Sequence, residues 1–152
     1  YEGDRFLLGT AQMDVQSVLE AGRAASGQWH GIDPGTMMGH VHLETTDIAL
    51  SKSFYVDTLG FDVTMDMAQA SFMSVGGYHH HLAVNTWGRR SRPAAHGDDA
   101  IALLHYEIRL PDTATLGRLA AAQGQDAPQG GVLEVDDPTG IRVRFTTAAW
   151  PG

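Results

Sequence analysis

The chain has 152 residues, 43% of them hydrophobic, which is enough to bury one core and predicts a single folded domain. A formal net charge of −8 argues against nucleic acid and anionic membranes as partners, because both bind basic surfaces. The absence of cysteine excludes disulfides and thiolate metal sites. No apolar run approaches the ~20 residues of a membrane-spanning helix and no signal peptide is evident, so a cytoplasmic protein is expected.

Residues 1–37 are expected to form an arm or linker that leads into the domain. Asp14 can cap a short helix over residues 15–21 that stops at Gly22, and Gly, Ser and Pro then dominate up to Gly35. The chain begins with a residue other than Met, which fits a piece of a longer protein.

Module one, residues 38–88, is predicted to be a β-α-β-β-β unit. Asp47 is a suitable N-cap for a helix whose apolar stripe ends at Gly60. The last two strands are expected to be joined by a tight turn at Gly76 and Gly77. The strands of this module are expected at residues 39–45, 61–66, 70–75 and 79–87.

Module two, residues 101–148, is predicted to repeat this unit. A strand at 103–110 is followed by a helix that Asp112 caps and that ends at Gly124. A hairpin is expected from strands at 131–135 and 141–147, around the turn Asp137-Pro138-Thr139-Gly140. The fourth strand is hard to recognise and is expected near residues 125–128.

The two modules begin alike, which indicates an internal duplication. His40 opens the first strand of module one and Asp47 follows seven residues later; His105 and Asp112 stand in the same relation in module two, 65 residues further along the chain. If the two modules pack about a pseudo-twofold axis, His40 and His105 come together as a pair of imidazoles.

Several motifs resemble the vicinal oxygen chelate superfamily, which contains glyoxalase I, bleomycin resistance proteins and extradiol dioxygenases. The resemblance covers roughly residues 38–147. Segment 76–87 is similar in particular to the bacterial catechol-2,3-dioxygenase-like branch, and the chain resembles the C-terminal domain of those proteins. It implies an α+β fold of two βαβββ modules that form an open, cup-shaped mixed sheet with helices on the outside. The motifs are Gly39-His40, Asp47, Phe54-Tyr55-x3-Leu59-Gly60-Phe61 and Asp137-Pro138-x-Gly140.

The resemblance also implies a divalent metal, Fe(II) or Mn(II), with His40 and His105 as ligands. The third ligand of the family is a glutamate, and Arg144 stands at that position. A guanidinium repels a dication and offers no lone pair. Glu107 lies on the same strand face as His105, about 6.6 Å further along, and is the nearest substitute ligand. Glu134 is another candidate, although either glutamate could simply form an ion pair with an arginine of the last strand.

The run His79-His80-His81 contributes further candidates. On a strand, His79 and His81 would share one face and His80 would take the other, so the three are not by themselves a metal site. The resemblance implies that His80 is the acid/base catalyst beside the bound substrate, a role that suits an imidazole. His42, His81 and Trp87 are expected to contact a small aromatic ligand.

We predict the first of three possible functions and keep the other two as alternatives. The first is an extradiol-type dioxygenase, an oxidoreductase that cleaves a catechol-like ring, and the retained histidines favour it. The second is metal-free binding of a small molecule, as in bleomycin resistance proteins, and the third is a purely structural domain; Arg144 favours these two. A homodimer or a companion N-terminal domain is the expected partner, since open sheets leave exposed edges.

Overall fold

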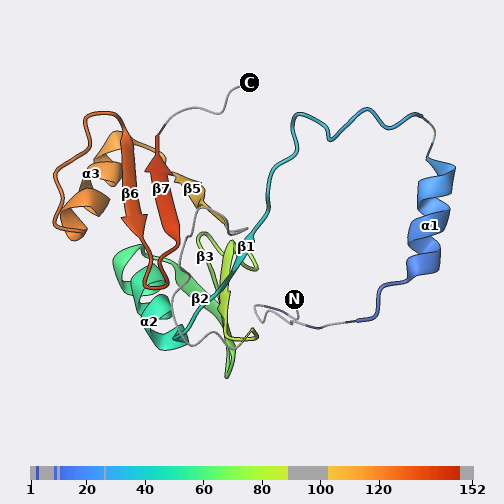
Figure 1. Cartoon of the computed structure of the whole chain (residues 1–152), viewed down its shortest axis with the longest axis horizontal. Coiled ribbons are helices and arrows are strands. Elements are labelled where there is room, and N and C mark those ends of the chain that lie inside the picture. The colour runs from blue at the N-terminus through green and yellow to red at the C-terminus, as the bar shows by residue number, and fades with distance from the viewer. Residues whose placement is uncertain (1–2, 4–8, 10, 26, 89–102, 148–152) are drawn as a thin grey trace. The chain divides into compact units, whose positions relative to one another are not determined.

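The computed structural model describes residues 3, 9, 11–25, 27–88 and 103–147 (Figure 1). The chain divides into two compact units, residues 1–39 and 40–152. In the first unit, helix α1 (Val15–Ala24) begins where the Asp14 side chain accepts a hydrogen bond from the Ser17 amide at 3.0 Å. The helix runs past Gly22 instead of stopping there, because a glycine weakens a helix without ending it. All of its residues are exposed.

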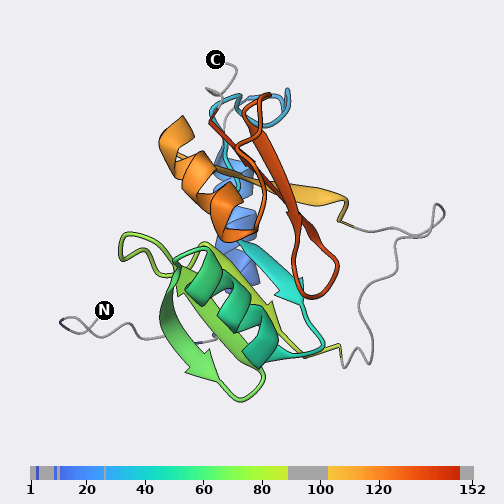
Figure 2. The same cartoon turned by 90° about the vertical axis from the view of Figure 1, so that its left-hand side faces the viewer.

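Module one of the second unit forms a four-stranded sheet in the order β1-β4-β3-β2. β1 and β4 are parallel, and the other two pairings are antiparallel. Asp47 caps α2 as predicted, and α2 contacts β3 and β4 across one face of the sheet (Figure 2). The elements are β1 (Val41–Glu44), α2 (Ile48–Ser53), the π-helical turn η1 (Phe54–Thr58), β2 (Asp62–Met67), β3 (Ala70–Ser74) and β4 (Leu82–Asn85).

The fourth strand of module one starts later than predicted. It begins at Leu82, and residues 75–81 form a seven-residue loop in which Gly76 and Gly77 have φ angles of 68° and 74°. Two consecutive left-handed residues turn the chain away from the sheet before the histidines are reached. The prediction that the histidine run lies on a strand was therefore wrong, and so was the alternation of faces built on it.

Module two forms a three-stranded sheet in the order β5-β7-β6, with β5 parallel and β6 antiparallel to β7. Its elements are β5 (His105–Arg109), α3 (Thr113–Ala122), β6 (Val132–Asp136) and β7 (Arg142–Thr146). Residues 125–128 do not form the strand expected there. Pro128 has no amide hydrogen for a ladder, and its carbonyl instead accepts from Gly131 at 3.2 Å. Within the described residues, module two is thus β-α-β-β.

The fold is the predicted α+β class, built of two small mixed sheets that stay open. Two of the three hydrophobic clusters described in the second unit share Phe54, Leu59, Tyr106 and Ile108, so the core is continuous between the modules. In the part of the chain that the structure describes, no helix combines the length and the apolar character needed to cross a bilayer.

A buried hydrogen-bond network joins the two signature motifs. The Tyr55 hydroxyl donates to Asp137 Oδ2 at 2.7 Å and accepts from the Tyr106 hydroxyl at 2.9 Å. The other carboxylate oxygen of Asp137 accepts from the Thr139 amide, the Thr139 hydroxyl and the Ile141 amide, at 2.7 to 2.9 Å. Burial raises the pKa of Tyr55 and that of Tyr106 above the ordinary range. The Phe-Tyr motif of module one is therefore bonded to the Asp-Pro-x-Gly turn of module two.

Candidate functional site

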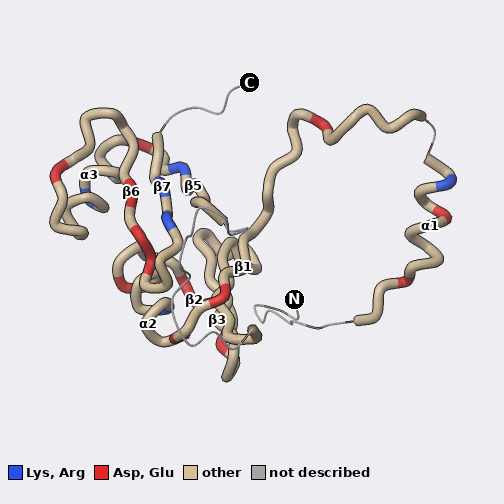
Figure 3. Tube along the Cα trace, in the orientation of Figure 1, with Lys and Arg blue, Asp and Glu red and all other residues tan. Residues whose placement is uncertain are grey.

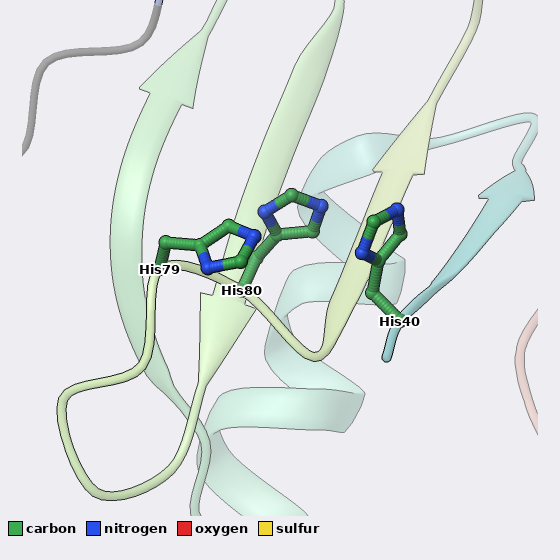
Figure 4. Close-up of side chains that lie close together, drawn as sticks. All are labelled: His40, His79 and His80. Carbon is green, nitrogen blue, oxygen red and sulfur yellow. The ribbon is translucent and has the colours of Figure 1, made fainter. Parts of the chain in front are cut away.

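Four histidines of module one gather at the start of β1 and at the end of the loop before β4. We call His40, His42, His79 and His80 the histidine cluster. The ring centroid of His80 lies 4.4 Å from that of His40, 5.1 Å from that of His42 and 4.6 Å from that of His79. The ligand atoms of His40, His79 and His80 all lie within 4.8 Å of one another (Figure 4).

Backbone hydrogen bonds hold the two segments that carry the cluster. The Val41 amide donates to the carbonyl of His81 at 3.0 Å, and the His81 amide donates to the carbonyl of Met73 at 2.9 Å. From β2, the Thr64 hydroxyl donates to the carbonyl of His79 at 2.7 Å. The loop is thus fixed to the sheet on both sides of the histidine run.

The surroundings of His80 and His42 favour neutral imidazoles. His80 is only 6% exposed, and its burial, together with repulsion from the neighbouring histidines, lowers its pKa to about 4. Burial and the nearby His40 also lower the pKa of His42. The Nε2 atoms of His42 and His80 are 3.0 Å apart, and His80 Nδ1 is buried without a hydrogen-bond partner. Both rings therefore carry lone pairs at neutral pH.

Two larger aromatic rings adjoin the cluster. Phe72 of β3 is buried, with its centroid 5.8 Å from that of His42 and 5.2 Å from that of His80. Trp87 is 56% exposed and lies 6.4 Å from His42. Imidazole, phenyl and indole rings thus lie together on one module, as an aromatic ligand would require.

His81 makes different contacts from the other predicted contact residues. Its ring stacks on Tyr78 with the centroids 4.7 Å apart, and its Nδ1 accepts from the Val75 amide at 3.3 Å. The ring is exposed and belongs to the loop's own packing. His81 therefore offers a matched control for experiments on its neighbours.

His105 has different neighbours from His40. It is exposed on β5, and the Arg144 guanidinium reaches its Nε2 at 3.4 Å. Glu107 and Glu134 are both opposite Arg144 in the sheet register, on the two strands that flank it. Arg144 Nε lies 3.1 Å from Glu134 Oε1, and its Nη1 lies 4.0 Å from Glu107 Oε2. Figure 3 shows acidic residues on β6 beside basic residues on β7.

These contacts test whether the residues fit the metal that the resemblance implies. A site of two histidines and one carboxylate needs three lone pairs directed at one point. A guanidinium stands at the third position and donates to His105, and both candidate carboxylates face it. The residues around His105 therefore do not fit a divalent ion. Among the described residues, the group that could hold a metal ion consists of His40, His79 and His80. It does not include His105 or Glu107.

One known protein has a similar sequence over most of this chain. No family model matches the chain. A catechol-2,3-dioxygenase from Bacillus subtilis (strain 168) is 34% identical over 117 residues, which cover 76% of this chain and 40% of that protein. The chain thus spans less than half the length of this relative.

Solved structures of low sequence identity share the architecture. They include a lactoylglutathione lyase from Agrobacterium tumefaciens (TM-score 0.54, 16% identity, 75% of this chain and 95% of that one). A glyoxalase family protein from Enterococcus faecalis has a TM-score of 0.56 at 17% identity, over 74% and 98% of the two chains. The fold is that of the glyoxalase-like proteins. Together with the curated relative, this fold supports the resemblance to the vicinal oxygen chelate superfamily that the motifs carry.

Proposed function

We propose that this chain is a small-molecule-binding domain that holds an aromatic ligand against the histidine cluster. The observation that carries the proposal is the position of Arg144, whose guanidinium faces His105 where the family's metal carboxylate would be. The aromatic rings and neutral imidazoles of module one remain, and they supply binding without the family's metal centre.

The chemistry of the cluster suits a catechol-like molecule. Phenolic hydroxyls both donate and accept hydrogen bonds, and each neutral imidazole has one N–H donor and one acceptor nitrogen. The exposed rings of His40, His42 and Trp87 are accessible to such a ligand, and Trp87 offers a stacking surface. The name of the Bacillus subtilis relative, catechol-2,3-dioxygenase, favours an aromatic diol over other planar ligands.

Quenching of tryptophan fluorescence by catechol tests the proposal. The untagged protein is first freed of metal with a chelator, so that the imidazoles alone are measured. We expect saturable binding that His42→Ala weakens about tenfold, the equivalent of one lost hydrogen bond. His81→Ala, the matched control, should leave binding unchanged. Absence of saturable binding, or equal losses in both variants, would contradict the proposal.

The second candidate function is extradiol cleavage of a catechol. The sequence identity to a catechol-2,3-dioxygenase favours it, as does His80, which is unprotonated near neutral pH and so suits the acid/base role. Ring cleavage is assayed by adding Fe(II), catechol and oxygen to the protein and following the absorbance of the product. We expect no turnover, because Arg144 replaces a ligand. Turnover that His80→Gln abolishes would establish the second function in place of the first.

We also propose that a second domain or a second copy of the chain completes the protein. The curated relative is more than twice as long as the matched region. The sheet orders leave β1, β2, β5 and β6 at edges, where a partner could add or cover strands. Light scattering during size-exclusion chromatography measures the mass of the chain in solution. A mass of two chains supports a dimer, and a monomer supports a companion domain.

A further inference from the structure

We propose that His40, His79 and His80 together bind one divalent transition-metal ion of the zinc class. This position differs from the expected pairing of His40 with His105. It also goes beyond the proposed function, because a metal ion can bind these imidazoles with or without an aromatic ligand.

The geometry of the three imidazoles is close to that of a metal site. Zinc binds imidazole nitrogens at about 2.0–2.1 Å, which in a tetrahedral site places the nitrogens about 3.4 Å apart. The ligand atoms of His40, His79 and His80 lie within 4.8 Å of one another. Rotations that move each ring by about an ångström would therefore close the site around an ion. Figure 4 shows that the three rings come from two segments, the residue before β1 and the loop before β4.

The backbone that carries these rings is already in place. The hydrogen bond from Val41 to His81 joins the start of β1 to the end of the loop. The hydrogen bond from Thr64 fixes the backbone of the loop at His79, which is one of the three ligands and the sequence neighbour of another, His80. Only side-chain rotation is left to occur when an ion binds, which lowers the entropy cost of binding.

His80 has the hydrogen-bonding pattern of a metal-bound histidine. Such a histidine binds the ion with one nitrogen and uses the other for a neighbouring protein group. His80 Nε2 pairs with His42 Nε2 at 3.0 Å, whereas its Nδ1 is buried without a partner. When the His80 Nε2–H donates to His42, the lone pair is on Nδ1. A buried polar atom in this state is expected to have a partner, and a metal ion would supply one.

The donor set selects the kind of ion. Imidazole nitrogens suit zinc, copper and nickel, whereas magnesium and calcium prefer oxygen ligands. Three protein ligands leave a fourth tetrahedral position for water or another molecule, as in open zinc sites. The contacts described for Arg144 are with residues of module two, namely His105, Glu107 and Glu134. The guanidinium that disfavours a metal ion at His105 is therefore bound to its own module.

Calorimetric titration of the untagged, chelator-treated chain with Zn²⁺ alone tests the proposal. We expect one ion per chain. His79→Gln should weaken binding on the order of 100-fold, since even the loss of a supporting group outside the ligand set costs 10–100-fold. His81→Gln and His105→Gln should bind like the parent. The first is the sequence neighbour of His80, and the second removes the alternative partner of His40.

A second measurement separates loss of a ligand from loss of structure. Co²⁺ in place of Zn²⁺ should give the visible absorption of a four-coordinate site, which His79→Gln abolishes without changing the far-ultraviolet circular dichroism. His79 is partly exposed, so this variant is expected to fold, whereas His80 is buried and its variant requires the fold check. Absence of stoichiometric binding would overturn the proposal. So would binding that His105→Gln abolishes and His79→Gln does not. Neither result bears on catechol binding, which is measured without metal.

Discussion

Replacing Tyr55 by phenylalanine removes one oxygen atom from the interior and should lower the stability of the domain by about 3 kcal/mol. The side chain is completely buried, and its hydroxyl makes two hydrogen bonds, one to the Asp137 carboxylate and one from the Tyr106 hydroxyl. A hydrogen bond to a charged group contributes about 1.5–3 kcal/mol and a neutral one about 0.5–1.5 kcal/mol. The aromatic ring remains, so the packing of the core changes little.

The variant also leaves groups without partners, which is why the loss should exceed that of a surface hydrogen bond. Asp137 Oδ2 loses the Tyr55 hydroxyl in a site that is only 4% exposed. Tyr106→Phe removes only the neutral bond and should cost about 1 kcal/mol. Because both variants remove the bond between the two hydroxyls, the double variant should lose about 1 kcal/mol less than the sum of the single ones.

Urea unfolding followed by circular dichroism measures these free energies from the midpoint at an unchanged slope. Tyr78→Phe is the matched control, because Tyr78 is exposed and the same atom is removed; its stability should stay within about 0.5 kcal/mol of the parent. A loss below about 1 kcal/mol in Tyr55→Phe would refute the reasoning. It would mean that the three donors to the other oxygen of Asp137 are sufficient for the buried carboxylate.

Two further predictions concern the histidine loop. Gly77→Ala should destabilise the protein by about 1–2 kcal/mol in the same urea assay, because Gly77 has a φ of 74°, and it should also weaken Zn²⁺ binding. The second prediction concerns His80, whose pKa is 6.5 in the unfolded chain and about 4 in the folded protein. The metal-free protein should lose stability as the pH falls from 6.5 towards 4, because the unfolded chain binds a proton there and the buried ring does not. The loss should reach about 2 kcal/mol at a pH of about 5 and should be missing in His80→Gln, as urea midpoints at several pH values will show.

The parts of the fold that local chemistry determines could be predicted from the sequence. Asp47 and Asp112 cap their helices as expected, with side chains that accept from the amides of Leu50 and Thr115 at 3.0 and 2.7 Å. Capping depends on residues three positions apart, so a single sequence contains the whole signal. The π-helical turn at residues 54–58 could not be predicted in this way, because a one-residue change in helical hydrogen bonding leaves the apolar stripe almost unaltered.

The contacts of Arg144 depended on a register that the sequence left open. Glu134 could have faced either side of the hairpin, since a shift of one residue reverses every side chain on a strand. The observed register pairs Glu134 with Arg144, and the parallel pairing of β5 with β7 puts Glu107 on its other flank. Both carboxylates therefore pair with the guanidinium of Arg144. Of the two interpretations, an ion pair and a substitute metal ligand, the contacts agree with the ion pair. Arg144 thus supplies a partner to three neighbouring side chains, those of His105, Glu107 and Glu134.

The duplication was informative about the fold, but the two histidines that it pairs have different neighbours. It correctly paired the openings of the two modules, where His40 precedes β1 and His105 begins β5. In module one, the loop before β4 brings His79 and His80 to His40, because β1 and β4 are paired and parallel. In module two the corresponding neighbour of β5 is β7, which is likewise parallel to it, and β7 presents Arg144 instead of an imidazole. Two equivalent histidines thus acquired different chemistry through the strand that pairs with each.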